Sequence, residues 1–487
     1  MMPRPDSQLE RRLANEHQTL ALPLRALVRR PPVVCRERST VREALAIMRA
    51  EGIGAIVVVD ARAHPVGIFT ERDLAGAVID GRLEQAIADV MTRDPLDLPG
   101  HAPAYEAALA MIDHRIRHVL VTETDVLVGV VSERDLFSLQ RLGLGELTMA
   151  IRLAPDVDAL GALAERVRRL TRLLVEQGVA ADRLTLFVSV LNDRICQRII
   201  ELARNRHHWD GIGWCWLAFG SEGRLEQTFA TDQDNGLIFE SHSDAPPSEV
   251  RATLLPFARE VNLALDACGY PLCKGNVMAS NPELCLSVAE WRAKMEGWLH
   301  NADPKALLDA TICFDFRAMH GDRRLAAVLR EWLLGTARTS AAFLRLMAEN
   351  ALQARPPLGT WRDFATEDAP NAPKTINLKL HGVRPFVDAA RIMALARGLP
   401  QTATAERLQA AAAAGAIPTV EAEAAVASFF FVQEIRLRHQ AALETLTDET
   451  ANRIDPVRLN ELDRRTLKEA FRIARDVQSR VALDYQL

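Results

Sequence analysis

The chain has 487 residues, of which 48% are hydrophobic and 25% are charged, and its formal net charge at pH 7 is −5. This length exceeds what one hydrophobic core supports, so about three domains are expected. A slightly acidic chain lacks the basic field that nucleic-acid binding needs, which excludes a nucleic-acid partner. No window approaches about 18 uninterrupted apolar residues, and the charged N-terminus has no apolar signal-peptide core. We therefore expect no membrane association and a cytoplasmic location.

Seven cysteines are scattered along the chain, mostly inside apolar runs: Cys35, Cys196, Cys215, Cys268, Cys273, Cys285 and Cys313. Their odd number and irregular spacing match neither a disulfide framework nor a zinc-binding pattern. They are predicted to be buried thiols in a reducing compartment.

An internal repeat follows a polar N-terminal tail, residues 1–23. The segment Gly67–Leu74 reads GIFTERDL and recurs as GVVSERDL at Gly129–Leu136. Each copy comes after a β-branched run, and each run comes after a stretch with apolar residues at helical spacing. Two copies of a strand-helix-strand-strand-helix unit are therefore predicted.

This repeat resembles a tandem pair of CBS (cystathionine-β-synthase) domains, over residues 24–142. In that family the Thr or Ser and the Asp of the repeat bind the ribose of an adenosine nucleotide, which implies Thr70 with Asp73 and Ser132 with Asp135. A carboxylate accepts both ribose hydroxyls, while the Thr or Ser caps the next helix near the phosphates. The alternative is that these residues are only helix caps, since S/T-x-x-D is also a capping pattern. The resemblance further implies AMP, ADP or ATP as a regulatory ligand and a homodimer through this pair.

Residues 143–210 are predicted to form a linker and a helical hairpin. Gly143–Pro155 contains G-L-G and a proline, which is typical of a linker. Asp156–Gln177 and Asp182–Arg206 carry apolar residues at helical spacing and predict the hairpin. The polar pair Asn192-Asp193 in the second helix is interpreted as structural.

The next predicted domain, residues 211–322, is organised around the string WCWLAFGSEGRLEQTFATDQDNGLIFE at Trp214–Glu240. One apolar run breaks at a Gly-Ser pair, and a second apolar run follows Asp232 and Asp234, which predicts strand, loop and strand. Because residues i and i+2 of a strand point to the same face, the two carboxylates should converge. Neighbouring carboxylates repel each other, and the usual relief is a shared proton or divalent cations, among which Mg²⁺ suits hard oxygen ligands.

Upstream of the carboxylates lie groups that suit a triphosphate. Gly220 allows close backbone approach, Ser221 adds a hydroxyl and an N–H, and Arg224 supplies a guanidinium. The alternative is a hairpin whose acids merely face water, since D-x-D alone is a weak signal.

Glycine, serine, ten intervening residues and Asp-x-Asp resemble the signature of the DNA polymerase β-like nucleotidyltransferase superfamily. The longer string GSEGRLEQTFATDQDN resembles the bacterial PII uridylyltransferases and the nucleotidyltransferases fused to CBS domains. The resemblance implies Mg²⁺ on Asp232 and Asp234, with Ser221 and Arg224 also catalytic. The resemblance also implies that an NTP is bound by Gly220, Ser221, Arg224 and Lys274. Lys274 is the first residue of the segment KGNVMASNP, which resembles the segment that lines the nucleotide pocket in the CBS-linked family.

The pattern departs from the superfamily in one respect. Members often place a third carboxylate on a later strand, and the KGNVMASNP segment carries none. Asp315 is the best substitute, although a structural Asp315–Arg317 contact is equally open. General-base activation of an acceptor hydroxyl is therefore left undecided.

Trp291 and Trp298 are seven residues apart and are predicted to fill a hydrophobic core.

Residues 323–487 are predicted to be a C-terminal helical, substrate-binding domain, interrupted by a proline-rich loop at Arg355–Pro373. Lys374–Leu399 resembles the segment that follows the catalytic core in PII uridylyltransferases. There, basic residues approach the nucleotide or acceptor, which implies Lys374, Lys379, His381 and Arg384; ordinary solvated charges are the alternative.

The expected fold class is α/β plus α, with a tandem CBS pair, a polymerase β-like core with a mixed sheet, and a C-terminal helical bundle. The leading hypothesis is Mg²⁺-dependent transfer of a nucleoside monophosphate from an NTP to a protein or small-molecule hydroxyl, regulated by adenine nucleotide at the CBS pair. The alternatives are a catalytically inactive, nucleotide-sensing signal-transduction protein and a CBS-based adapter for another protein. Joint presence of Ser221, Arg224, Asp232 and Asp234 favours the enzyme.

Overall fold

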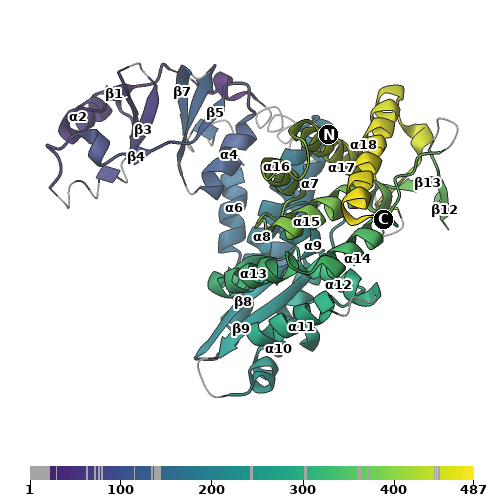
Figure 1. The fold of residues 1–487 in the computed structure, drawn as a ribbon. Coiled ribbons are helices and arrows are strands. Elements are labelled where there is room, and N and C mark those ends of the chain that lie inside the picture. Colours follow the sequence, from purple (N-terminus) through teal and green to yellow (C-terminus); the bar gives the residue numbers. More distant parts are fainter. Residues whose placement is uncertain are drawn as a thin grey trace, which may run out of the picture. The chain divides into compact units, whose positions relative to one another are not determined.

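The structure is a computed structural model, and it describes residues 22–28, 30–61, 64–70, 73–74, 77, 81–114, 116–124, 126–132, 135–136, 144–241, 245–300, 304–359, 364–369, 372–443, 445, 447 and 450–487. Most of the predicted N-terminal tail lies outside these residues. The chain divides into two units, residues 1–149 and residues 150–487, and each is considered by itself (Figure 1).

The first unit shows the strand-helix-strand-strand part of both predicted copies, and the closing helix of each copy lies largely outside the described residues. Its first copy contains β1 (Val34–Arg36), α2 (Val41–Glu51), β2 (Ala55–Val59) and β3 (Pro65–Thr70), with the short β4 (Thr92–Arg93) beside β3. Its second copy contains β5 (Asp97–Pro99), α4 (Ala104–Asp113), β6 (His118–Glu123) and β7 (Val126–Ser132). In each copy the first strand is parallel to the second, and the second is antiparallel to the third.

Helix α2 shows how local sequence sets these elements. The Thr40 side chain accepts from the Glu43 N–H, while the Glu43 carboxylate accepts from the Thr40 N–H, which is a capping box. At the other end Gly52 adopts the left-handed conformation that stops the helix. Between its two ends, α2 buries Val41, Ala44 and Met48 against apolar residues of β2 and β3.

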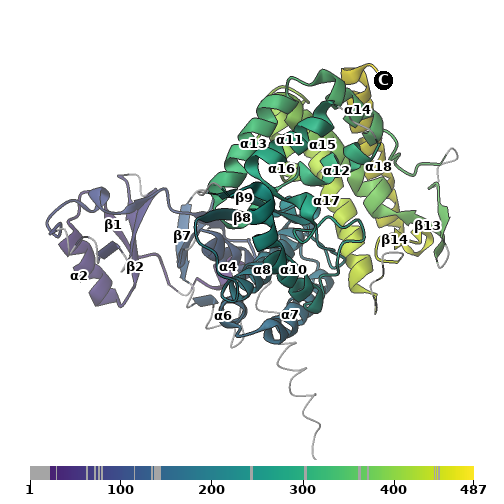
Figure 2. The same cartoon turned by 90° about the horizontal axis from the view of Figure 1, so that it is seen from below.

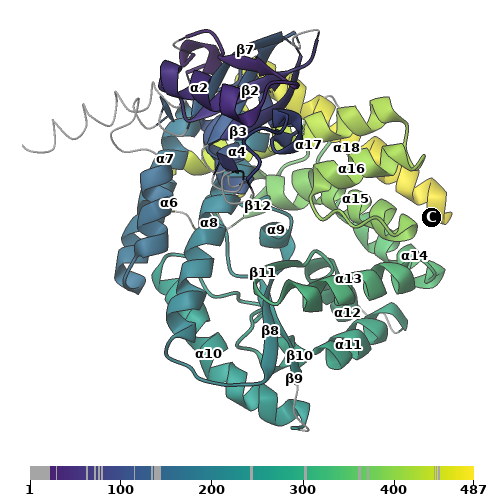
Figure 3. The same ribbon diagram turned by 90° about the vertical axis from the view of Figure 1, so that its left-hand side faces the viewer.

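The second unit contains a mixed sheet with the strand order β10-β9-β8-β11. Its strands are β8 (Ile212–Ala218), β9 (Asn235–Ser241), β10 (Cys285–Ser287) and β11 (Arg317–Gly321). Strand β9 is antiparallel to β8 and parallel to β10, and β11 is antiparallel to β8. Helices α8 and α10 cover one face of the sheet, and α11 and α13 cover the other (Figure 3).

Helices precede, cover and follow this sheet. Those before and around it are α6 (Leu144–Leu153), α7 (Val157–Glu176), α8 (Ala181–Arg204), α9 (Gly220–Gly223), α10 (Pro247–Ala267), α11 (Val288–His300), α12 (Pro304–Cys313) and α13 (Arg323–Ala337). Those after it are α14 (Ala341–Ala351), α15 (Arg384–Arg397), α16 (Thr404–Ala413), α17 (Thr419–Ala441) and α18 (Glu461–Tyr485). The later helices pack on one another as a bundle (Figure 2).

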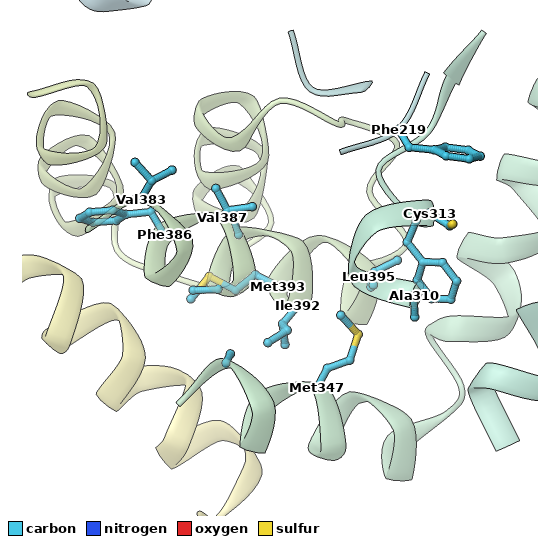
Figure 4. Close-up of a cluster of buried hydrophobic side chains, with 14 of the residues drawn as sticks. Phe219, Ala310, Cys313, Met347, Val383, Phe386, Val387, Ile392, Met393 and Leu395 are labelled. Atoms are coloured by element: carbon cyan, nitrogen blue, oxygen red, sulfur yellow. The ribbon is translucent and has the colours of Figure 1, made fainter. Parts of the chain in front are cut away.

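One hydrophobic core joins the sheet to the bundle. The same buried cluster contains Phe219, which directly follows β8, Cys313 of α12, Met347 of α14 and Ile392 of α15 (Figure 4). The predicted catalytic core and the predicted C-terminal domain therefore fold around shared apolar contacts. Trp291 and Trp298 lie in this cluster, which confirms their predicted core role.

The structure corrects the sequence prediction in three places. The predicted linker forms α6, because Leu147 and Ile151 are one helical turn apart and both are buried. Strand β11 was not predicted, since its five residues follow a helix without an alternating pattern. The predicted proline-rich loop contains β12 (Glu367–Ala369) and the start of β13 (Ala372–Asn377), and β13 also pairs with β14 (Arg453–Ile454).

Candidate functional site

The Gly-Ser turn and the carboxylate pair lie side by side. Strand β8 ends at Ala218, and α9 is a single turn that starts at Gly220 with φ +54. A side chain at Gly220 would place its Cβ 3.0 Å from Asp234 Oδ2, so glycine permits this approach. Asp232 and Asp234 lie in the extended segment just before β9 rather than within it. The predicted convergence of loop and acids is therefore present.

Gly223, the second glycine of the motif, fixes α9 against the rest of the sheet. A Cβ at Gly223 would lie 1.8 Å from the backbone oxygen of Asp315, a distance that no side chain tolerates. The single turn that presents Ser221 is thus seated directly on the segment that leads into β11.

Asp232, Asp234 and Cys273 form a group of three donors whose ligand atoms all lie within 4.8 Å of one another. The Cys273 thiol hydrogen-bonds the Asp234 carboxylate. Burial and then the charge of Asp232 raise the pKa of Asp234 to about 6, against the lowering effect of Lys379. Sequence reasoning missed Cys273, because its spacing from the acids in the chain suggests no contact.

The two amide residues that alternate with the acids, Gln233 and Asn235, explain the orientation of the carboxylates. Gln233 and Asn235 point into the protein, where Asn262 of α10 donates to Gln233 Oε1 at 2.7 Å and to Asn235 Oδ1 at 2.9 Å. The Gln233 side chain in turn donates to the Asn262 backbone oxygen at 2.9 Å. Since alternate residues of an extended chain face opposite sides, these buried amides turn Asp232 and Asp234 outward.

Asp315 is not the third metal ligand. Its side chain is fully buried, and Arg391 binds it through two bonds of 3.0 and 2.6 Å, Arg407 through one of 2.6 Å and Arg224 through one of 2.7 Å. Burial alone would raise the pKa of Asp315, but these guanidinium groups outweigh it and hold that pKa far below its usual range. The alternative Asp315–Arg317 contact is also wrong, because Arg317 pairs with Asp193 at 2.9 Å.

Arg224 belongs to the same buried ion-pair cluster. Its Nε donates to Glu226 at 2.7 Å, and the other Glu226 oxygen accepts from the Thr404 N–H at the start of α16 at 2.6 Å. At Asp234 the guanidinium acts through its charge, which lowers the Asp234 pKa. Contact of Arg224 with a phosphate stays a prediction.

Glu222, inside the Gly-Ser turn, is a carboxylate that sequence reasoning did not single out. Burial, followed by the charge of Asp193, raises the pKa of Glu222 to about 8, and both Asp234 and Asp232 add to this effect. Glu222 is part of the GSEGRL string, but the sequence analysis looked for a further carboxylate only on a later strand and so did not consider it.

The basic candidates after the core differ in position. Lys379 is exposed on a π-helix, Leu378–Val383, and its charge lowers the pKa of Asp234. His381 instead lies between the Arg355 carbonyl at 3.0 Å and Glu367 at 2.7 Å. The backbone N–H of Lys374 donates to Asp368, and the Arg384 side chain donates to Asp388.

Two further residues from the sequence analysis, Lys274 and Asn192, have different surroundings. Lys274 is exposed and follows Cys273 directly. Asn192 accepts from the Tyr270 hydroxyl at 2.8 Å and donates to Gln227 at 3.1 Å. These contacts support the structural interpretation of the Asn192-Asp193 pair.

In the first unit, both predicted nucleotide motifs have the same geometry. Asp73 Oδ2 accepts from the Thr70 N–H at 2.9 Å and its hydroxyl at 2.7 Å, and Asp135 Oδ2 accepts from the Ser132 N–H at 2.9 Å and its hydroxyl at 2.5 Å. The capping pattern is therefore present. All four residues also line one cavity of about 1740 Å³.

Comparison with family models matches three parts of the chain. Residues 24–80 and 87–141 match the model "CBS domain", and residues 165–305 match "Putative nucleotidyltransferase DUF294". Residues 341–485 match "Putative nucleotidyltransferase substrate binding domain". Separately, no helix among the described residues combines the length and apolar character that crossing a membrane requires.

Individual relatives cover only part of the chain. The uncharacterized protein YlbB of Bacillus subtilis is 36% identical over 105 residues, which is 21% of this chain and 71% of that protein. An uncharacterized 17.7 kDa protein of Acidianus ambivalens is 30% identical over 104 residues, 21% of this chain and 63% of its own length. Among solved structures, the CBS domain protein PAE2072 from Pyrobaculum aerophilum complexed with AMP is 30% identical, with 26% of this chain and 100% of that chain covered and a TM-score of 0.24.

Proposed function

Because the chain belongs to the CBS-domain proteins and carries the DUF294 nucleotidyltransferase and substrate-binding domains, we propose that it moves a nucleoside monophosphate from an NTP to a hydroxyl group. The observation that carries the proposal is the meeting of the Gly220 turn with Asp232 and Asp234. In this proposal the sheet β10-β9-β8-β11 is a polymerase β-like core, as in the PII uridylyltransferases that the motif resembles.

The donor set fits a divalent cation. The charge of Asp232 opposes ionisation of Asp234, and a bound cation would relieve this repulsion. Mg²⁺ is held by such oxygen ligands, and when bound it neutralises triphosphate charge and polarises the reacting phosphoryl group.

The remaining roles fall to residues around this pair. The backbone N–H groups and hydroxyl of the Ser221 turn would receive phosphate oxygens, and the exposed cations Lys274 and Lys379 would offset triphosphate charge. Among the described residues, no carboxylate takes the place of Asp315 beside the pair, because the donors that lie together are Asp232, Asp234 and Cys273. Catalysis of this kind depends on positioning, so few groups need to be chemically reactive.

The C-terminal bundle would hold the acceptor, which is a protein or small-molecule hydroxyl. The bundle packs on the core around shared apolar contacts, so an acceptor bound there has a defined position relative to the turn.

A second candidate function, an inactive nucleotide-sensing signal-transduction protein, is favoured by one observation. Arg224 and Asp315 are both engaged in a buried ion-pair cluster rather than in the metal group.

At the CBS pair we propose regulation by AMP, ADP or ATP, with a homodimer formed through residues 24–142. The supporting observation is that Thr70, Asp73, Ser132 and Asp135 all line the same cavity although they come from two copies of the repeat. Oδ2 of each carboxylate accepts from its own turn, and in this proposal the ribose hydroxyls would contact the same two carboxylates.

A labelling experiment tests the transferase. The full chain is incubated with each α-³²P-labelled NTP, Mg²⁺ and native lysate, and label transfer and pyrophosphate release are measured. We expect both for the wild type, and neither for the double variant Asp232→Asn, Asp234→Asn, although it still folds. The double variant Asp455→Asn, Asp476→Asn, on the far C-terminal segment, is the control and should match the wild type. A wild type that is inert with every NTP would favour the inactive sensor.

A further inference from the structure

We infer that Cys273 is the third protein ligand of the metal group, so that this site binds thiophilic divalent ions such as Zn²⁺ or Co²⁺ more tightly than Mg²⁺. The inference rests on the proposed function for the two carboxylate ligands, and it adds a soft donor that sequence spacing did not indicate. Its geometric basis is the approach of the Cys273 sulfur and one oxygen each of Asp232 and Asp234 to within 4.8 Å of one another.

The backbone holds Cys273 opposite Asp234. On one side of Asp234, the Gln233 N–H donates to the Pro271 oxygen at 3.1 Å. On the other side, the Asn235 N–H donates to the Val277 oxygen at 3.1 Å. The segment that carries Cys273 is thus fastened to the acid segment before and after the thiol. This double attachment makes the proximity of sulfur and carboxylate a property of the fold.

The thiol is also distinct from the other cysteines. All seven cysteines lie among the described residues, and six of them are buried, whereas Cys273 is half-buried. The expectation that every cysteine is a buried thiol is therefore wrong for Cys273. An ion that reaches Asp232, which is exposed, can also reach this sulfur.

Burial and then the charge of Asp234 raise the pKa of the Cys273 thiol, and hydrogen bonds from two backbone N–H groups oppose this effect. The backbone N–H groups of Gly275 and Val277 point at the Cys273 sulfur, and the thiol hydrogen bond runs to Asp234. When a metal ion binds, the thiol proton leaves to solvent and the ion replaces it between sulfur and carboxylate. The backbone donors then remain to stabilise the thiolate.

The donor types set the metal preference. Carboxylate oxygens alone suit Mg²⁺, whereas a thiolate favours softer ions, and affinity for nitrogen, oxygen and sulfur sites rises from Mn²⁺ towards later first-row metals. Three protein ligands leave further coordination positions for a substrate oxygen, as in catalytic zinc sites. The same site would therefore accept Mg²⁺ with a triphosphate and retain Zn²⁺ or Co²⁺ without one.

Cobalt spectroscopy on the full chain tests this inference without measuring activity. We expect Co²⁺ to give a thiolate-to-cobalt charge-transfer band in the near ultraviolet, which Cys273→Ser and Cys273→Ala both abolish. Zn²⁺ affinity, measured by chelator competition, should fall at least about tenfold in these variants, the low end of what loss of even an outer-shell metal partner costs. Mg²⁺ affinity should stay unchanged, and Cys273→Asp should increase it.

Cys268→Ser is the matched control, because that thiol donates to the Val157 oxygen and a hydroxyl can do the same. It should keep the wild-type band. Co²⁺ binding that depends on Asp232 and Asp234 but shows no charge-transfer band would overturn the role of Cys273 and leave the carboxylate site standing. Absence of any metal binding that depends on those two acids would overturn the site as well.

Discussion

Asp234 and Asp315 are both aspartates of the second unit, yet their surroundings shift their pKa values in opposite directions. Asp234 is half-buried beside another carboxylate, and its pKa rises to about 6. Asp315 is fully buried among three arginines, and its pKa falls far below the usual range. The difference separates a group suited to receive a cation from a group that already has its counter-ions.

The raised pKa of Asp234 predicts that Asp234→Asn stabilises the metal-free protein. A carboxyl group whose folded pKa lies above its unfolded value favours folding when protonated, so its ionisation costs stability as pH rises from about 4 through 6. At pH 7.5 with chelator, the variant should gain on the order of 1–3 kcal/mol in free energy of unfolding, while losing metal binding. Chemical denaturation of the variant and the wild type across this pH range measures the difference in their free energy of unfolding.

The gain of Asp234→Asn should shrink as pH falls from 6 to 4, where the wild-type carboxyl is protonated too. Asp476→Asn on α18, which replaces an exposed carboxylate, is the control and should show no such trend. A gain that is constant with pH would contradict the assignment.

Asp315 gives the opposite prediction. Asp315→Asn leaves Arg391, Arg407 and Arg224 without their shared carboxylate, and breaking a buried pair in this way typically costs about 3–5 kcal/mol. Glu469→Gln, in an exposed pair with Arg472, should cost less than about 1 kcal/mol. Urea unfolding of each variant and of the wild type measures both losses of stability.

Because the folded pKa of Asp315 is depressed, its contribution is complete above the unfolded pKa, about 4, and is lost only as pH falls through the folded value. The cost of Asp315→Asn should therefore be constant between pH 5 and 8. A cost that changes within that window would argue against the three-arginine cluster.

At the scale of elements, the one-turn helix α9 connects the sheet, the acid pair and the bundle. Gly220 faces Asp234, Gly223 touches the Asp315 backbone, and Glu226 just beyond receives the first N–H of α16. Substrate groups bound at the bundle and at the turn would therefore be positioned by the same short segment.

Gly223→Ala tests how tightly this turn is held. The added Cβ would lie 1.8 Å from the Asp315 oxygen, so α9 must move. We expect a loss of about 1–3 kcal/mol from overpacking and a loss of NTP binding. Gly297→Ala on α11 is the control, since nothing lies within 4 Å of its Cβ and helical alanine should add about 0.5–1 kcal/mol. Equal NTP affinity of Gly223→Ala and wild type, measured by calorimetry, would contradict this account of the turn.

At the scale of the whole molecule, two units carry two proposed nucleotide sites, and their coupling is measurable. If adenine nucleotide at the CBS pair regulates the transferase, it must change NTP affinity, and NTP must change adenylate affinity by the same factor, typically about 5–150-fold. Two calorimetric titrations, each with the other site empty and then filled, check this reciprocity. Asp135→Ala should remove the effect of the adenine nucleotide. Identical constants with and without the second ligand would show two independent units on one chain.

Much of this organisation follows from local sequence. The repeat of GIFTERDL and GVVSERDL predicts the paired modules, because strand and helix periodicity is a property of neighbouring residues. The alternation in Asp232-Gln233-Asp234-Asn235 likewise predicts convergent acids, since opposite faces of an extended chain require only the geometry of consecutive residues. The hairpin of α7 and α8 follows from the same kind of pattern.

Other features depend on contacts between distant residues. Asp315 was a candidate metal ligand by sequence, and only folding shows that Arg391 and Arg407, the latter 92 positions away, surround it. Cys273 joins the acids because backbone bonds attach its segment on both sides of Asp234. The physical reason is common to both: burial and Coulomb interactions depend on distance in space, and spacing along the chain does not specify which charges and donors the packed core brings together.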